Sequence, residues 1–149
     1  MKRRIMIIDD EPAILQSLRR MFRITPCAYG ILVYELDIEL FESPLAALAR
    51  ARLCEFDAFL SDYRMAEMDG VTFLTAIREI QPDAVQILLS GTGDRASVER
   101  AFQGPRIFRF VAKPWDDATL IGAVAEALTY RDIMQKRPQV HQERQVGDD

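Results

Sequence analysis

The chain has 149 residues, 49% of them hydrophobic and 28% charged, and its formal net charge is −4 at pH 7. This length suits one domain with a substantial core, and the composition is typical of a globular protein. The negative charge argues against direct binding to nucleic acid or to an anionic membrane surface, because both favour an excess of Lys and Arg.

The first third of the chain alternates apolar runs with segments of helical periodicity. Residues 4–8 (RIMII) are a β-branched run typical of a strand that is buried on both faces. A helix is predicted from Pro12, since its apolar residues fall on one stripe and proline is tolerated in a first turn. A strand at 31–41 follows, and then a helix at 43–52 that opens with a serine cap and a proline.

The same alternation continues to about residue 130. The predicted elements are a strand at 56–61, a helix at 70–80, a strand at 84–90, a polar helix at about 94–103, a strand at 107–112 and a last helix that ends near 130. Five strands that alternate with helices predict an α/β fold with a doubly wound, five-stranded parallel sheet and right-handed crossovers.

Two segments do not fit this alternation. Residues 24–40 are long for one connection and one strand, and the excess is either a partner contact or, as we favour, a longer strand. Residues 131–149 lose the apolar rhythm and are rich in Gln, Arg and Pro. We therefore predict one domain over residues 1–130, followed by a helix end and a disordered polar tail or linker stub.

The sequence also predicts a cytoplasmic location. The apolar run Ile5–Ile8 is too short for a signal peptide, and no segment approaches the roughly 20 apolar residues of a membrane span. Cys27 and Cys54 lack the spacing of metal ligands, which favours two reduced thiols.

Chemically active side chains stand at the ends of four of the five predicted strands. In chain order they are Asp9, Asp10 and Glu11, then Asp62, then Ser90, and then Lys113. Each residue alone has an ordinary explanation as a cap, a turn residue or a solvated charge. Because the carboxyl ends of parallel strands meet at one edge of a sheet, we interpret the set as one site.

Three aspartates at this edge require a positive partner. Two carboxylates about 4 Å apart repel by about 4 kcal/mol at an effective dielectric of about 20, so Asp9, Asp10 and Asp62 must take up protons or a cation. Carboxylate oxygens without a nearby His or Cys favour Mg²⁺. With its charge neutralised, Asp62 is able to act as a nucleophile toward phosphorus, while the metal, Lys113 and Ser90 satisfy the three phosphoryl oxygens.

Four motifs resemble, in order and spacing, those of bacterial response-regulator receiver domains over about residues 3–130. They are IMIIDDEP, FLSDYRMAEMDG, ILLSGTGD and FRFVAKPWD. The resemblance implies a flavodoxin-like fold with strand order 2-1-3-4-5. It also implies that Asp62 is phosphorylated by a sensor histidine kinase or a phosphotransfer protein, in a two-component system or phosphorelay. The chain would then be a signalling phosphoacceptor and not an enzyme.

The resemblance also assigns roles to the other residues of the site. The Mg²⁺ ligands that it implies are the carboxylates of Asp9, Asp10 and Asp62 and the backbone carbonyl of Arg64. Ser90 and Lys113 would contact the phosphoryl group. The Lys113–Pro114 peptide would be cis, which is plausible because X–Pro bonds make the cis form inexpensive.

The family's switch implies a signalling surface. Ser90 would move toward the phosphate, and the aromatic residue three positions before Lys113 would rotate into the vacated space. That residue is Phe110 rather than the frequent Tyr, and a core-facing strand residue explains it equally well. The surface would comprise the helix at 94–103, the strand at 107–112 and the last helix. An output domain, a partner protein or a second copy of the chain would dock there.

Two other classes of function share parts of this pattern. The alternative is a Mg²⁺-dependent aspartyl-phosphate phosphohydrolase, but that class carries an Asp-x-Asp motif after its first strand, whereas Asp9 and Asp10 are adjacent. A flavodoxin-like cofactor binder would need a Ser/Thr/Gly-rich phosphate loop at the same place. His141, the single histidine, lies in the polar tail, so the phosphodonor is expected from another protein. Whether the chain acts alone or belongs to a larger protein stays open.

Two residues depart from the family pattern after Asp62. Ala66 replaces a frequent proline, which suggests a looser loop. Arg64 is long and cationic, and we hypothesise that it shields the phosphoryl group from water or helps to hold it. Arg64→Ala should therefore shorten the lifetime of the acyl phosphate, measured as the rate of dephosphorylation. An unchanged lifetime would refute this hypothesis.

Overall fold

The computed structural model describes residues 1–101 and 107–147, so the end of the helix predicted at 94–103 lies outside the described residues. The strands are β1 Lys2–Ile8, β2 Cys27–Tyr29, β3 Leu32–Phe41, β4 Ala58–Asp62, β5 Val85–Ser90 and β6 Arg109–Ala112. The helices are α1 Pro12–Ile24, α2 Pro44–Ala51, α3 Gly70–Ile80, the short 3₁₀ helix η1 Thr92–Asp94, α4 Arg95–Ala101 and α5 Asp117–Gly147. Among the residues described, no helix is long and apolar enough to cross a membrane.

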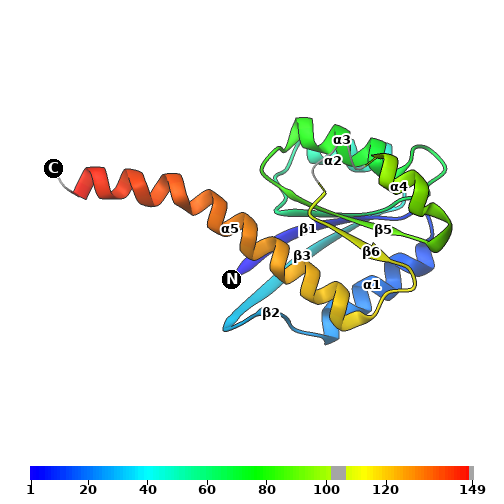
Figure 1. The fold of residues 1–149 in the computed structure, drawn as a ribbon, viewed down its shortest axis with the longest axis horizontal. Coiled ribbons are helices and arrows are strands. Elements are labelled where there is room, and N and C mark those ends of the chain that lie inside the picture. The colour runs from blue at the N-terminus through cyan, green and yellow to red at the C-terminus, as the bar shows by residue number, and fades with distance from the viewer. Residues whose placement is uncertain (102–106, 148–149) are drawn as a thin grey trace.

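The predicted α/β fold is confirmed. Five strands pair in parallel in the order β3-β1-β4-β5-β6. When these five are numbered in chain order, leaving out the antiparallel strand β2, this is the 2-1-3-4-5 order implied by the resemblance. Figure 1 shows α1 and α5 on one face of this sheet and α2, α3 and α4 on the other. The parallel pairing brings the carboxyl ends of all five strands to one edge.

The predicted count of five strands was one too few. Within residues 24–40 the chain makes a hairpin, in which β2 pairs antiparallel with β3 at the edge of the sheet. Gly30 occupies the turn with φ +62, a left-handed conformation that glycine adopts without a steric penalty. A strand of three residues is too short to give a periodic signal, so the sequence pattern did not distinguish it from a loop.

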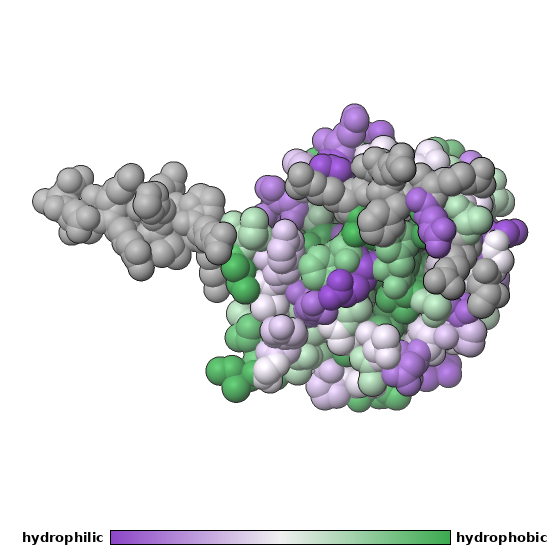
Figure 2. All heavy atoms as spheres, viewed as in Figure 1, coloured by the Kyte–Doolittle hydropathy of each residue, from purple (hydrophilic) through white to green (hydrophobic). Residues whose placement is uncertain are grey.

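The hairpin exposes apolar side chains. Tyr29, Ile31 and Val33 are among the exposed large hydrophobic residues, and Ile31 is 98% accessible. Figure 2 shows apolar atoms gathered at the lower left of the molecule, where the turn between β2 and β3 lies in Figure 1. The opposite side of the hairpin is packed, because Cys27 and Tyr34 belong to the core beneath α5.

Alternate residues of the strands bury both faces of the sheet. On β1, Ile5 and Ile7 face the core shared with α1 and α5, whereas Met6 and Ile8 face the core shared with α2, α3 and α4. All four side chains are fully buried. This two-sided burial explains why the strands read as continuous apolar runs rather than as alternating patterns.

The last helix is longer than the sequence predicted. Its backbone continues to Gly147, and Figure 1 shows its C-terminal part extending away from the sheet. Gln, Lys, Arg and Glu are frequent in this segment and have good helix propensity, which the prediction of a polar tail undervalued. The domain boundary at residue 130 stays a prediction.

Three polar contacts hold α5 against the sheet near the amino ends of the strands. The hydroxyl groups of Tyr34 and Thr129 lie 2.7 Å apart, and Arg3 forms an ion pair of 2.6 Å with Asp132. A third contact joins Arg131 of α5 to Asp57, which precedes β4, at 2.7 Å. The helix is therefore fixed by packing and by charge where it leaves the sheet.

A glycine allows α3 to start close to the end of β4. The Gly70 N–H donates a hydrogen bond of 2.7 Å to the carbonyl oxygen of Tyr63. A Cβ at Gly70 would clash with the carbonyl oxygen of Asp62 and would lie 2.8 Å from Leu88 Cδ1. Only glycine therefore permits this approach without a shift of the backbone at Asp62.

Gly70→Ala should lower the free energy of unfolding by about 2–3 kcal/mol, because the added methyl group overpacks a rigid backbone contact. Urea denaturation measures this change. Gly122→Ala is the matched control. This exposed residue of α5 has open space at its Cβ, so the substitution should raise the free energy of unfolding, by about 1 kcal/mol at most. Equal stabilities for the two variants would contradict the prediction.

Candidate functional site

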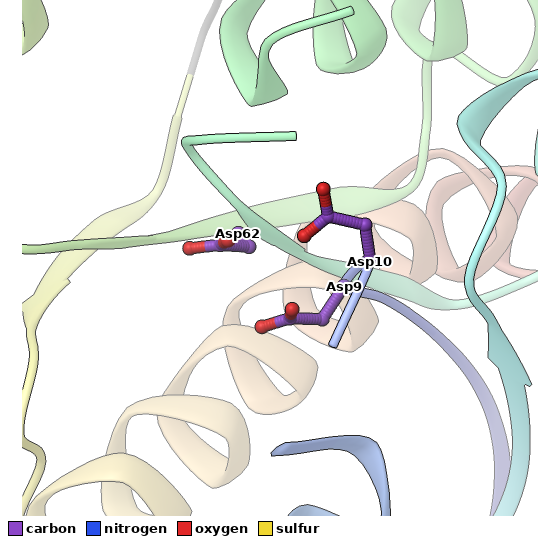
Figure 3. A group of neighbouring side chains, drawn as sticks. All are labelled: Asp9, Asp10 and Asp62. Atoms are coloured by element: carbon purple, nitrogen blue, oxygen red, sulfur yellow. The ribbon is translucent and has the colours of Figure 1, made fainter. Parts of the chain in front are cut away.

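The strand register places Asp9 beside Asp62 at the carboxyl edge of the sheet. Ile8 of β1 pairs with Ser61 of β4, so the residues that follow them are neighbours on adjacent strands. One carboxylate oxygen from each of Asp9, Asp10 and Asp62 lies within 4.8 Å of the other two. Figure 3 shows these three carboxylates converging from the ends of β1 and β4.

Lys113 supplies the positive charge that faces this cluster. Its Nζ lies 2.6 Å from Asp62 Oδ1 and 3.3 Å from Asp9 Oδ2. The backbone N–H of Lys113 donates a hydrogen bond of 2.8 Å to the carbonyl oxygen of Ser90, which ties the residue to the end of β5. The Lys113–Pro114 peptide is cis. The side chain thus reaches the acidic cluster from β6, two strands away from β4.

Burial sets the protonation behaviour of the two inner aspartates. Asp9 is 1% exposed and Asp62 is 6% exposed. Burial raises the pKa of both carboxyl groups, and Lys113 opposes part of this rise. Burial lowers the pKa of Lys113, but its contacts with the two carboxylates outweigh burial and leave the pKa raised. The ammonium therefore stays charged at neutral pH.

The raised pKa values of Asp9, Asp62 and Lys113 make the stability of the protein depend on pH. A carboxyl group with a raised folded pKa binds protons more tightly in the folded state than in the unfolded state. Its contribution to stability is thus full below the ordinary value of 3.8 and is lost as the pH rises through the folded pKa. The contribution of Lys113 is full below its ordinary value of 10.5 and is lost as the pH rises through its higher folded pKa.

The donor set fits a hard divalent cation. All three side chains offer carboxylate oxygens, and Asp10 is more exposed to solvent than the other two, which leaves room for bound water. Mg²⁺ prefers such oxygen ligands and retains several waters. The predicted role of the Arg64 backbone carbonyl as a further ligand stays a prediction.

The two predicted switch residues lie on β5 and β6, the strands that lead to Ser90 and Lys113. Ser90 is the last residue of β5 and pairs with Ala112 of β6, immediately before Lys113. Phe110 lies in β6, partly buried against the core that contains α3 and α4. This position agrees with a core-facing residue and does not test the proposed rotation, so both interpretations of Phe110 remain.

The Arg64 side chain contacts a residue that the sequence analysis did not select. Its guanidinium forms an ion pair with Asp94, and it remains 74% exposed. Asp94 is buried and also accepts a hydrogen bond of 3.1 Å from the Gly91 backbone N–H. An aspartate at the start of a predicted helix is commonly a cap, so nothing in the sequence pattern singled it out. The hypothesis that Arg64 acts on a phosphoryl group stays untested.

The loop after Asp62 is held at two further points. The backbone N–H of Ala66 donates a hydrogen bond of 3.0 Å to Asp10 Oδ2. The Ser43 hydroxyl, which caps α2, donates a hydrogen bond of 2.6 Å to Glu67. A proline at position 66 would have no N–H to donate. The replacement that suggested a looser loop thus adds a contact to the acidic cluster.

Comparisons with known proteins agree with this geometry. Residues 5–125 match the family described as the response regulator receiver domain. Over 83% of the chain, the sequence is 32% identical to the transcriptional regulatory protein GlrR of Escherichia coli and 30% identical to the hydrogenase transcriptional regulatory protein HoxA of Bradyrhizobium diazoefficiens. The chain spans 26% and 24% of these two proteins.

A solved structure gives the same result. The signal receiver domain of an HD domain-containing protein from Pseudomonas fluorescens is 29% identical, with a TM-score of 0.75. The superposition covers 89% of this chain and 98% of that one. The likeness therefore extends over nearly the whole of that receiver domain.

Lys113→Met should lower the free energy of unfolding at pH 7 by about 3 kcal/mol, because it leaves two buried carboxylates without their counter-charge. The loss should shrink as the pH falls through the raised pKa values of Asp9 and Asp62, since both groups then take up protons. Urea denaturation at pH 7 and pH 4.5, without divalent cations, measures both effects.

Arg109→Met serves as the control for removing a cation. Arg109 forms an ion pair of 2.6 Å with Glu126, and both side chains are substantially exposed. Its removal should cost less than about 1 kcal/mol. A loss for Lys113→Met that is equally small, or that does not depend on pH, would contradict the assigned role of this ion pair.

Proposed function

Since the chain belongs to the response-regulator receiver family, we propose that it accepts a phosphoryl group on Asp62 from a sensor histidine kinase or a phosphotransfer protein. The observation that carries this proposal is the contact of Lys113 with Asp62 inside a cluster of three aspartates. A nucleophilic carboxylate, a fixed ammonium and an oxygen-rich cation site are what transfer of a phosphoryl group to an aspartate requires.

In the proposed reaction an oxygen of the Asp62 carboxylate forms a bond to phosphorus. The bond between phosphorus and the donor's histidine nitrogen breaks, and that nitrogen takes up a proton from solvent. Lys113 exchanges its contact with the carboxylate for one with a phosphoryl oxygen, and the Ser90 hydroxyl donates to a second oxygen. Lys113 is already charged and close to Asp62, so little reorganisation is needed.

The cation site completes the assignment. Asp9, Asp10, Asp62 and the Arg64 backbone carbonyl would hold Mg²⁺. A bound Mg²⁺ would neutralise the carboxylates and the charge on the transferring group. Burial of Asp9 and Asp62 supports this role, since buried carboxylates favour a strongly bound positive partner.

We assign the response to phosphorylation to the surface formed by α4, β6 and α5. Ser90 would move toward the phosphoryl group, and Phe110 would follow into the space that it leaves. The surface would then control an output domain or a partner protein, with a homodimer as a further form. The names of GlrR and HoxA describe transcriptional regulation, which supports a regulatory output of this kind rather than catalysis.

Acetyl phosphate with Mg²⁺ should phosphorylate the protein. The carboxylate of Asp62 displaces acetate, and the product carries one phosphoryl group that hydroxylamine removes, as expected of an acyl phosphate. Intact mass spectrometry detects the adduct. Asp62→Ala should abolish it, because the nucleophile is gone.

Asp83→Ala is the matched control, since Asp83 is exposed and precedes β5 at the opposite edge of the sheet. This variant should form the adduct at the wild-type rate. A hydroxylamine-sensitive adduct that persists in Asp62→Ala would move the site elsewhere. Rapid, repeated release of phosphate from acetyl phosphate without accumulation of the adduct would favour the phosphohydrolase instead.

A further inference from the structure

The three aspartates of the cluster are not held in the same way. Asp9 and Asp62 are buried, and both contact the Lys113 ammonium. Asp10 lies after the end of β1 and is more exposed than the other two. In the described part of the chain, the polar contact of its carboxylate is with the Ala66 backbone N–H, at 3.0 Å.

Electrostatics acts against the observed position of Asp10. One carboxylate oxygen of Asp10 lies within 4.8 Å of one oxygen from each of Asp9 and Asp62, and like charges at this separation repel each other. An aspartate that reaches solvent and is repelled by its neighbours lowers its electrostatic energy by turning toward the water. A hydrogen bond from a backbone amide to a carboxylate is charge-assisted and opposes this movement.

The Ala66 amide is itself firmly placed. The loop that carries it begins at the end of β4, and the hydrogen bond between Gly70 and Tyr63 closes this loop on itself. The contact between Glu67 and Ser43 ties the same loop to the start of α2. The N–H group therefore points at Asp10 from a support that does not depend on Asp10.

We propose that the Ala66 backbone amide positions Asp10 for cation binding and so raises the affinity of the site for Mg²⁺. The proposal rests on the proposed function in taking Mg²⁺ as the cation. The amide acts from outside the ligand set: it engages Asp10 Oδ2, and the remaining lone pairs of the carboxylate stay available. A chain with proline at this position lacks the donor, so the effect depends on position 66 being occupied by a residue other than proline, here alanine.

The test measures Mg²⁺ affinity without phosphorylation. Isothermal titration calorimetry of wild type, Ala66→Pro and Ala66→Gly with MgCl₂ gives the dissociation constants. Thermal unfolding at increasing Mg²⁺ gives an independent estimate, because an ion that binds only the folded state adds RT ln(1 + c/Kd), with c the free Mg²⁺ concentration, to the free energy of unfolding. Ala66→Pro removes the donor and should raise the dissociation constant about tenfold, as is usual when a second-shell partner is lost. Ala66→Gly retains the N–H and should bind within about twofold of wild type.

A phosphorylation assay separates positioning from general damage. With acetyl phosphate, Ala66→Pro should need about tenfold more Mg²⁺ for half-maximal rate but should reach the wild-type rate at saturating Mg²⁺. A lower rate at saturation with an unchanged Mg²⁺ requirement would overturn the proposal.

A backbone ester removes the donor with less change to the chain. Proline also restricts the residue before it, so a semisynthetic protein with an ester in place of the Met65–Ala66 amide is the second variant. Its Mg²⁺ affinity should fall like that of Ala66→Pro. Wild-type affinity in the ester protein would overturn the proposal for Ala66 and leave the proposed function intact. A wild-type protein that binds no Mg²⁺ would overturn both.

Discussion

The ion pairs of Lys113 with Asp62 and Asp9 are the interaction on which the acidic site depends. Two carboxylates with almost no exposure to water, side by side on adjacent strands, oppose folding unless a positive charge faces them. The ammonium comes from the end of β6, so the cluster is compatible with the fold only when the whole parallel sheet has formed. Stability and the chemistry of the site are therefore set by the same contacts.

The loop between β4 and α3 joins the acidic site to neighbouring loops and helices. It leaves Asp62 and contacts three separate parts of the edge: Asp10 through the Ala66 amide, the start of α2 through Glu67, and the segment before α4 through Arg64. The last of these contacts joins the loop to the segment just before α4, and α4 belongs to the surface that we assign to output.

Two features set this chain apart from the simple five-stranded plan. The β2–β3 hairpin packs one side against α5 and exposes an apolar tip, and α5 continues well beyond the sheet. Both lie away from the acidic site, and contacts such as Tyr34 with Thr129 join them. They lie at the edge of the domain and contribute none of the three aspartates of the cluster.

The sequence by itself determined the parallel α/β plan and the identity of the site. Strands buried on both faces must be continuous apolar runs, and parallel strands must bring their terminal residues to one edge, so Asp9, Asp62, Ser90 and Lys113 were recognisable as a set. The three-residue strand β2 was not predicted, because so short a segment cannot show a hydrophobic periodicity.

Only the tertiary structure decided which groups meet within the site. The contact of Ala66 with Asp10 joins residues 56 apart, and that of Arg64 with Asp94 joins residues 30 apart. Such contacts depend on the conformation of loops, where composition and periodicity carry little information about direction. A sequence therefore shows which chemical groups a strand delivers, whereas the folded loops set the partners and distances of those groups.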